Sequence, residues 1–267
     1  MMVSLYLQAL LAMLALGGVT WLLSIFKRDV SIVDSIWSLM FVAAAIVYII
    51  HNQAFGWREI LIFSLVLIWA LRLAVYLTWR NWGQPEDSRY QQIRTKYSPH
   101  FALKSLLIIF VFQAVIAWLV SLPLLVTLAT SQAFSLLDGI AVILWLVGMG
   151  FETIADTQLY RFKSNPDNKG KVLDTGLWHY SRHPNYFGEF CIWWGFYLFA
   201  VSSGGWWTIL SPLMMSFLLL RFSGVALLEK DIHERRPAYR SYIARTNAFI
   251  PGKPRNRVAP TAKETSA

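Results

Sequence analysis

The chain begins with an apolar stretch, VSLYLQALLAMLALGGVTWLLSIF, which runs from Val3 to Phe26. A helix of about 20 apolar residues crosses the hydrocarbon core of a bilayer, whereas the apolar core of a signal peptide has only about 7–15. No basic region precedes this stretch and no clear small-residue cleavage site follows it. We therefore predict a transmembrane helix that is retained in the mature protein.

Six further apolar stretches follow along the chain. They are Ile32–Ile50, Ile60–Trp79, Leu106–Leu128, Gly139–Ile154, Phe187–Val201 and Trp206–Leu228. No alternating strand pattern occurs, so only helices are expected to cross the lipid. The sequence predicts an all-α membrane protein with about seven transmembrane helices in a single domain, residues 1–251. The Pro-, Lys-, Arg-, Thr- and Ala-rich residues 252–267 are predicted to be a disordered tail.

The composition agrees with a membrane protein. Of the 267 residues 56% are hydrophobic and only 15% are charged, whereas a soluble domain carries roughly 25% charged residues. The single cysteine, Cys191, excludes an intrachain disulfide. The net charge of +9 would suit nucleic acid, but the basic residues lie between apolar stretches and in the tail. Because membrane proteins retain basic residues on one side of the bilayer, we expect no nucleic-acid partner.

Basic residues occupy every second loop. They are Lys27 and Arg28; Arg80, Arg89, Arg94, Lys96 and Lys104; Arg161, Lys163, Lys169, Lys171 and Arg182; and Lys230, Arg235, Arg236, Arg240 and Arg245. The intervening loops are nearly bare, the first holding only His51 and Arg58. The positive-inside rule therefore predicts an outside N-terminus and a cytosolic C-terminus. We expect a multi-pass integral protein, in a bacterial inner membrane.

Ionisable residues within membrane segments usually mark function because they are costly there. Asp34 starts the second stretch, Arg72 lies within the third and Arg221 within the seventh. Asp34 and Arg72 could equally pair with each other or reach toward the membrane surface. Glu152 and Asp156 are four residues apart and share a helix face where the fifth stretch becomes polar.

The most informative stretch is GLWHYSRHPNYFGE, from Gly176 to Glu189. Pro184 is suited to the first turn of a helix, and the free amides there, beside Arg182 and His183, would suit a phosphate or another anion. Asn185, Glu189 and Trp193 follow at four-residue spacing, which makes a polar and then aromatic stripe along the sixth span. A carboxylate one turn into an apolar helix needs a partner, which the hydroxyls or the amide of a cofactor could provide.

Other common chemistries lack their motifs. The sequence contains no HExxH, GxSxG or Walker loop. His179 and His183 have the spacing of helical metal ligands, but Pro184 disfavours a continuous helix through both. We therefore predict no metal site.

The stretch Gly176–Glu189 resembles the C-terminal catalytic region of the steroid 5-alpha-reductase family. The resemblance extends to Leu228-Glu-Lys, to Arg235-Arg-Pro-Ala-Tyr-Arg-Ser-Tyr242 and to Phe249-Ile-Pro251, and is greatest to the bacterial membrane branch, whose substrates are generally undefined. It covers roughly Gly148 to Pro251, with a fainter likeness back to Arg72. Isoprenylcysteine carboxyl methyltransferases and phospholipid methyltransferases belong to the same superfamily and carry a similar Arg-His-Pro motif, but they bind S-adenosylmethionine.

The resemblance implies roles for particular residues. Asp156, Lys163 and Lys171 match positions that hold the adenosine and phosphate part of NADPH. Asn185 and Glu189 match positions that hold its nicotinamide end. Trp193 matches a residue that lines the substrate cavity. To these cofactor-binding residues we add Arg182, His183 and Arg236.

Three positions depart from the family pattern. Glu152 stands where the steroid enzymes have asparagine. The Gln-Glu pair that anchors their substrate is missing, so Asp34 is the nearest candidate for the catalytic acid. Asp34 and Glu189 are the two residues that we expect to be catalytic. Trp69 occupies the position at which the steroid enzymes have a substrate-binding tyrosine. Steroid itself is therefore a doubtful substrate.

The expected activity is NADPH-dependent reduction of a carbon–carbon double bond conjugated to a carbonyl, in a steroid- or lipid-like molecule that enters from the membrane. The basic residues Lys163, Lys171 and Arg182 favour a phosphorylated dinucleotide, and the Gly-Glu pair at 188–189 favours the reductase branch. The alternatives are an S-adenosylmethionine-dependent methyltransferase and a non-enzymatic or transport role.

Overall fold

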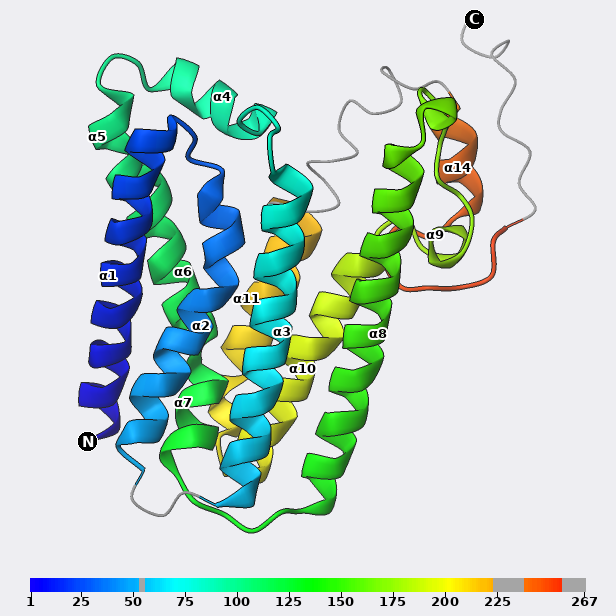
Figure 1. The fold of residues 1–267 in the computed structure, drawn as a ribbon. Helices are drawn as coiled ribbons and strands as arrows, with labels where there is room; N and C mark the ends of the chain where they lie inside the picture. The colour runs from blue at the N-terminus through cyan, green and yellow to red at the C-terminus, as the bar shows by residue number, and fades with distance from the viewer. Residues whose placement is uncertain (53–55, 223–237, 256–267) are drawn as a thin grey trace, which may run out of the picture. The chain divides into compact units, whose positions relative to one another are not determined.

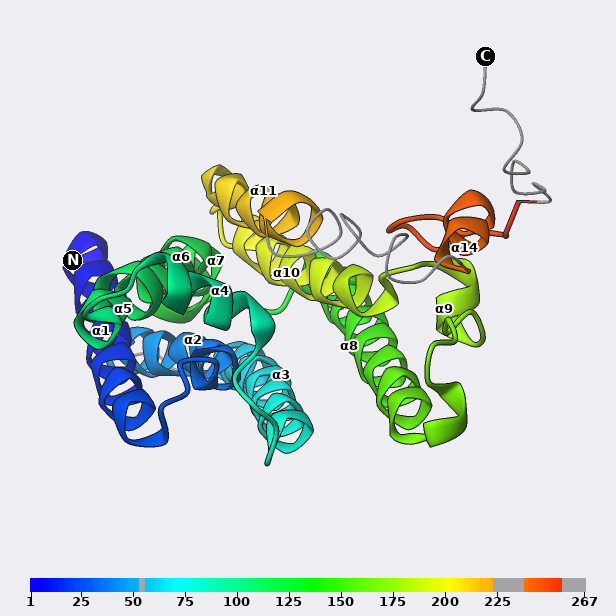
Figure 2. The same ribbon diagram turned by 90° about the horizontal axis from the view of Figure 1, so that it is seen from above.

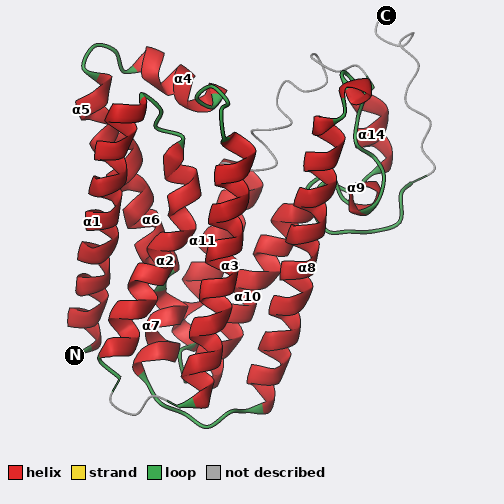
Figure 3. Cartoon of the chain, in the orientation of Figure 1, coloured by secondary structure: helices red, strands yellow, loops and turns green. Residues whose placement is uncertain are grey.

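The computed structural model describes residues 1–52, 56–222 and 238–255 (Figure 1). Within these ranges the chain forms helices and no strand (Figure 3). It divides into two compact units, one made of Met1–Asp138 with Phe199–Ser211 and the other of Gly139–Leu198 with Pro212–Ala267. We call them unit 1 and unit 2.

Unit 1 is built on three long helices, α1 (Met2–Lys27), α2 (Ile32–Ile50) and α3 (Trp57–Asn81). They lie side by side, and the later helices of the unit cover one face of α1 and α2 (Figure 2). Those later elements are α4 (Ser88–Lys96), α5 (Phe101–Ser105), a π-helical turn (Leu106–Val111), α6 (Phe112–Val120) and α7 (Leu122–Ala129).

Unit 2 contains most of α8 (Leu136–Ser164) and most of α10 (Pro184–Ser202). The segment between these helices holds a short 3-10 helix (Pro166–Asn168) and α9 (Leu177–Tyr180). After α10 comes a 3-10 turn (Trp206–Ile209), which belongs to unit 1. Unit 2 continues with most of α11 (Leu210–Phe217), a π-helical turn (Leu218–Phe222) and α14 (Tyr239–Arg245).

Among the described residues, five helices are long and apolar enough to cross a membrane. They are Met2–Lys27, Ile32–Ile50, Trp57–Asn81, Phe101–Val120 and Leu136–Ser164. The apolar helix Trp206–Arg221 is shorter, and the last six residues of the predicted seventh span, 223–228, lie outside the described residues. The predicted sixth span corresponds to α10, which is 19 residues long but is interrupted by polar side chains. These helices support a multi-pass integral membrane protein.

Two predicted spans have the wrong bounds. The fourth was expected as one helix, Leu106–Leu128, but α6 ends at Val120 and α7 begins at Leu122. Pro123 explains the break, because a proline inside a helix lacks an amide hydrogen and its ring clashes with the carbonyl four residues earlier. The fifth was expected to end at Ile154, yet α8 continues to Ser164. Its acidic residues lie on a buried face, so they do not end the helix.

A buried ionic cluster joins distant parts of unit 1. It was not predicted, because Arg58 was assigned to a loop. Arg58 and Asp138 are 3% and 0% exposed. The Nη2 of Arg58 donates to Oδ1 of Asp138 at 2.9 Å, to the carbonyl of Phe199 at 2.9 Å and to Oγ of Ser202 at 2.8 Å. The amide of Ser135 donates to the second oxygen of Asp138. The cluster therefore fastens the start of α3 to the start of α8 and the end of α10.

Candidate functional site

Two glycines bring α8 and α10 into close contact. A β-carbon on Gly188 would lie 2.5 Å from the carbonyl oxygen of Gly148 and 2.6 Å from the amide nitrogen of Glu152. Further along, a β-carbon on Gly195 would lie 3.1 Å from the carbonyl oxygen of Ala141. These pairings show that the helices run antiparallel, and small residues allow such close backbone approach in membrane helices.

Beside this crossing lies a strip of polar side chains, which we call the polar strip. It consists of the buried Glu152 and Asp156 from α8, and of the half-buried Asn185 and the buried Glu189 from α10. The three carboxylate residues are only 4–6% exposed. The Nδ2 of Asn185 donates to Oδ1 of Asp156 at 3.2 Å. The indole nitrogen of Trp193 donates to Oε1 of Glu189 at 2.9 Å. The structure thus brings together five residues that the sequence analysis singled out.

The strip contains a buried acceptor that the described residues leave unsatisfied. The Oδ1 of Asn185 is buried and accepts no hydrogen bond within the described ranges. Nearly all buried polar atoms have partners, because an unmade bond costs about 1–3 kcal/mol. Asn185 is therefore placed to accept a hydrogen bond from a bound molecule, such as one with an amide N–H.

The residues before α10 are fastened to the segment that follows α14. The guanidinium of Arg182 donates to the carbonyls of Ile243 and Thr246, and its amide donates to the carbonyl of Asn247 at 2.9 Å. Ser181 Oγ donates to the carbonyl of Phe249 at 2.7 Å. Arg182 is buried and bonds the end of α14, and its role in binding a phosphate stays a prediction. The sequence alone could not reveal this contact, because its partners are backbone carbonyls more than 60 residues away.

An aromatic wall runs along α10 and was also missed. Its ring centroids lie 5.1–6.3 Å apart, and it consists of Phe151, Phe187, Phe190, Trp194 and Phe249. Phe249 comes from the far end of the unit and meets both Phe187 and Phe190. The spacing of 187, 190 and 194 on one helix face was a readable signal for the wall.

The remaining residues expected to bind the cofactor differ in exposure. Lys163 and Lys171 are exposed on unit 2. His183 is buried and its ring stacks on Tyr186 with centroids 5.6 Å apart. Arg236 lies outside the described residues. No group of three or more His, Cys, Asp and Glu side chains that could hold a metal ion occurs in the part of the chain that the structure describes.

Asp34 and Trp69 belong to unit 1, whereas the polar strip belongs to unit 2. Asp34 accepts a hydrogen bond from Tyr90 at 2.5 Å and forms an ion pair with Arg89 at 2.9 Å. Its partners come from α4, so the pairing with Arg72 considered in the sequence analysis does not occur. Trp69 is fully buried and meets the ring of Phe41 edge-on at 5.6 Å.

The helices and the polar strip define a multi-pass membrane protein with a buried polar site in a helical bundle. The chain belongs to the family described as "Protein of unknown function (DUF1295)", whose model matches residues 20–246. This family includes steroid 5-alpha-reductase-like membrane proteins. The chain is 28% identical to an uncharacterized protein of Schizosaccharomyces pombe, over 92% of this chain and 79% of that protein. No solved structure matches the chain.

Proposed function

We propose that this protein is a membrane-embedded, NADPH-dependent reductase of the steroid 5-alpha-reductase type, from the bacterial membrane branch. It would reduce a carbon–carbon double bond conjugated to a carbonyl in a lipophilic substrate. The observation that carries the proposal is the polar strip with its unsatisfied acceptor, Oδ1 of Asn185. A buried acceptor beside an indole-bound carboxylate suits the carboxamide of a nicotinamide, which offers N–H donors.

The proposal gives each residue a specific part. Asn185 accepts a hydrogen bond from the carboxamide, and Glu189, fixed in orientation by Trp193, holds the same end of the cofactor. Lys163 and Lys171 are exposed and provide positive charge for the phosphates. When bound, NADPH supplies the hydride that adds to the β-carbon, and a proton completes the saturated product. Asp34 is the proposed acid on the strength of the family resemblance.

One observation favours the methyltransferase alternative. Three buried carboxylate residues, Glu152, Asp156 and Glu189, line the strip. A buried site rich in carboxylates suits a cationic ligand, and S-adenosylmethionine carries a positive sulfonium. The choice between the two activities therefore depends on the ligand that the strip accepts.

Isothermal titration calorimetry of the purified protein with NADPH, NADH and S-adenosylmethionine tests the proposal. We expect NADPH to bind most tightly, and Glu189→Gln to weaken it about tenfold or more because a charge-assisted bond is lost. Lys163→Ala with Lys171→Ala should weaken NADPH much more than NADH, because only NADPH carries the extra phosphate.

Lys169→Ala is the matched control, because this exposed lysine lies between the other two and has no assigned part. It should leave the preference for NADPH unchanged. Saturable binding of S-adenosylmethionine alone would move the protein to the methyltransferase branch. Binding of none of the three ligands would remove both proposed activities.

We also propose seven spans with the N-terminus outside and the C-terminus in the cytosol of a bacterial inner membrane. The alternation of basic and bare loops supports this topology. Reporter fusions after Ser131 and after Arg245 should lie on opposite sides of the membrane. Reporters that fall on the same side would rule out seven spans in this order.

A further inference from the structure

Helix α4 is fastened across one end of unit 1 by its apolar face. Tyr90 is buried, and Ile93 packs against the same cluster. That cluster also contains Val30, Val33, Phe101, Ile109 and Phe110. Figure 1 shows α4 crossing over the ends of the long helices of its unit. The opposite face of α4 is left for solvent or for the membrane surface.

Acidic residues neutralise the two arginines that hold α4 in place. Arg94 forms an ion pair with Glu86 at 2.7 Å, and Arg89 forms ion pairs with Asp87 at 3.0 Å and with Asp34 at 2.9 Å. Burial alone would raise the pKa of Glu86, but its hydrogen bonds from Arg94 and from the amide of Val30 outweigh burial and lower the pKa. Arg89 and Arg94 therefore serve the fold and offer little charge to a ligand.

Four other cations around α4 remain uncompensated. They are Lys27, Arg28, Lys96 and Lys104, all exposed. None of them forms an ion pair with another described residue. They belong to one region, because Arg94 donates to the carbonyl of Arg28 at 3.4 Å, and Lys104 donates to the carbonyl of Tyr97, next to Lys96, at 3.2 Å. The region thus presents a positive surface.

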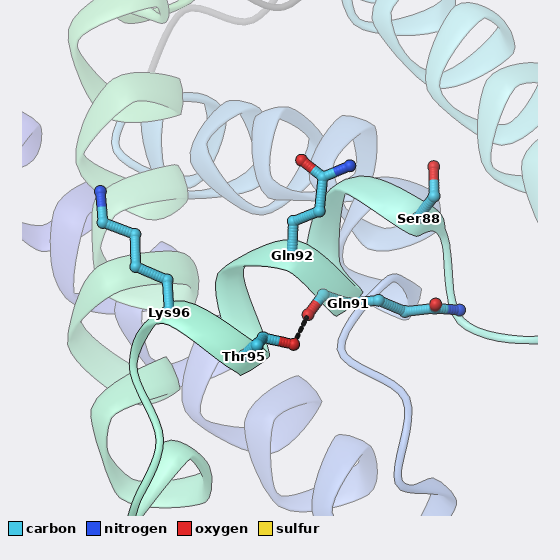
Figure 4. Close-up of a pocket in the computed structure, with 5 residues that line it drawn as sticks. All are labelled: Ser88, Gln91, Gln92, Thr95 and Lys96. Carbon is cyan, nitrogen blue, oxygen red and sulfur yellow. Dashed lines mark hydrogen bonds between the residues drawn. The ribbon is translucent and has the colours of Figure 1, made fainter.

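The outer face of α4 adds hydrogen-bonding groups to this charge. A shallow hollow there is lined by Ser88, Gln91, Gln92, Thr95 and Lys96. The side chains of Ser88, Gln92 and Lys96 project from the same side of the helix (Figure 4). The side chains of Gln91 and Thr95 already donate to nearby backbone carbonyls. One ammonium with a neighbouring hydroxyl and amide is a suitable set of donors for a phosphodiester.

Exposed apolar side chains adjoin the positive surface. Phe26 is 84% exposed, Trp82 75% and Leu103 67%. The ammonium of Lys27 lies 5.8 Å from the centre of the Trp82 ring. Tryptophans and lysines gather where spanning helices meet lipid headgroups. Because α1 and α3 are spanning candidates that end here, lipid phosphates would reach this surface without leaving the membrane.

We propose that Lys27, Arg28, Lys96, Lys104 and the hollow on α4 form a binding surface for the headgroup of an anionic phospholipid. The cations attract the phosphate, and Ser88 and Gln92 contact the headgroup. The adjoining apolar side chains lie beside the acyl chains. We call this the headgroup surface. The inference does not depend on the reaction proposed for the polar strip.

Native mass spectrometry tests this inference on the full chain released from detergent in the presence of phosphatidylglycerol or phosphatidylcholine. We expect selective retention of phosphatidylglycerol. Lys96→Ala with Lys104→Ala should weaken that retention by about fivefold for each lysine lost, or on the order of 25-fold together. The matched control, Lys169→Ala with Lys253→Ala, removes two exposed lysines from unit 2 and should retain the lipid as the native protein does.

Three results would overturn the proposal. They are equal retention of the two lipids, an unchanged affinity in the Lys96/Lys104 variant, and displacement of the lipid by millimolar inorganic phosphate, which would indicate a site for a soluble anion. In phosphatidylcholine alone, the Lys96/Lys104 variant should have the same circular dichroism spectrum and the same thermal unfolding as the native protein. A variant that fails to fold is replaced by Lys96→Gln with Lys104→Gln, and the same three criteria apply to it.

Discussion

Asp138→Asn is expected to lower the free energy of unfolding by about 3–5 kcal/mol, because it removes the carboxylate closest to the buried charge of Arg58, at 2.9 Å, and leaves only Glu59, at 3.9 Å, among the described residues. The carboxylate is fully buried and accepts bonds from Arg58, Ser135 and Ser202. Asparagine has nearly the same shape, so the change removes charge without opening a cavity. Equilibrium unfolding in mixed micelles, followed by circular dichroism, measures the loss.

Two comparisons separate the ion pair from other causes. Arg58→Met combined with Asp138→Asn and Glu59→Gln removes the buried arginine and both carboxylates paired with it. This variant should recover at least half of the lost stability, since replacing a whole buried ionic group is often neutral or stabilising. Asp167→Asn changes an exposed acid in the 3-10 helix Pro166–Asn168 and should stay within about 0.5 kcal/mol of the native protein. If Asp138→Asn behaves like Asp167→Asn, the cluster contributes no stability.

Gly188→Ala is expected to destabilise the protein by about 2–3 kcal/mol or more, although alanine normally stabilises a helix by about 0.5–1 kcal/mol relative to glycine. The added β-carbon would lie 2.5–2.6 Å from backbone atoms of Gly148 and Glu152, which have no side-chain freedom with which to move aside. The helices must separate, so the same variant should also weaken any ligand that binds to the polar strip. Thermal unfolding and calorimetry measure the two effects.

Gly150→Ala is a matched control on α8. A β-carbon at Gly150 meets nothing within 4 Å, so alanine there should be neutral or slightly stabilising. Equal effects of the two substitutions would contradict the close helix crossing. Loss of ligand without loss of stability in Gly188→Ala would instead mean that the glycine acts on the ligand directly.

Much of the fold could be read from hydropathy. The apolar stretches at Val3–Phe26 and Ile32–Ile50 correspond closely to α1 and α2, because a spanning helix satisfies its own backbone hydrogen bonds and needs only apolar side chains toward lipid. Hydropathy predicted the wrong helix bounds at Ser121, where a helix breaks, and beyond Ile154, where a helix continues. Pro123 ends a helix inside the apolar stretch, whereas the buried acidic face of α8 lets that helix continue to Ser164, and hydropathy detects neither effect.

The candidate site, like the fold, could be predicted from the sequence only in part. Four-residue spacing placed Asn185, Glu189 and Trp193 on one face of α10, and Glu152 and Asp156 on one face of α8, since helical geometry fixes which residues are neighbours. The hydrogen bond from Asn185 to Asp156 joins the two helices across 29 residues of chain. The partners of two arginines could not be predicted from the sequence. Arg182 donates to backbone carbonyls near α14, and Arg89 forms an ion pair with Asp34.

The amino-acid sequence was sufficient for the class of fold, the membrane location and the helix faces that carry polar residues, because all three depend on local composition and on the fixed period of a helix. Only the tertiary structure decided which charges are available to a ligand. Arg58 and Arg182 look like loop cations in the sequence and are buried in the fold. A charge is available only when no buried partner uses it, and such partners come from segments that the chain brings together only when it folds.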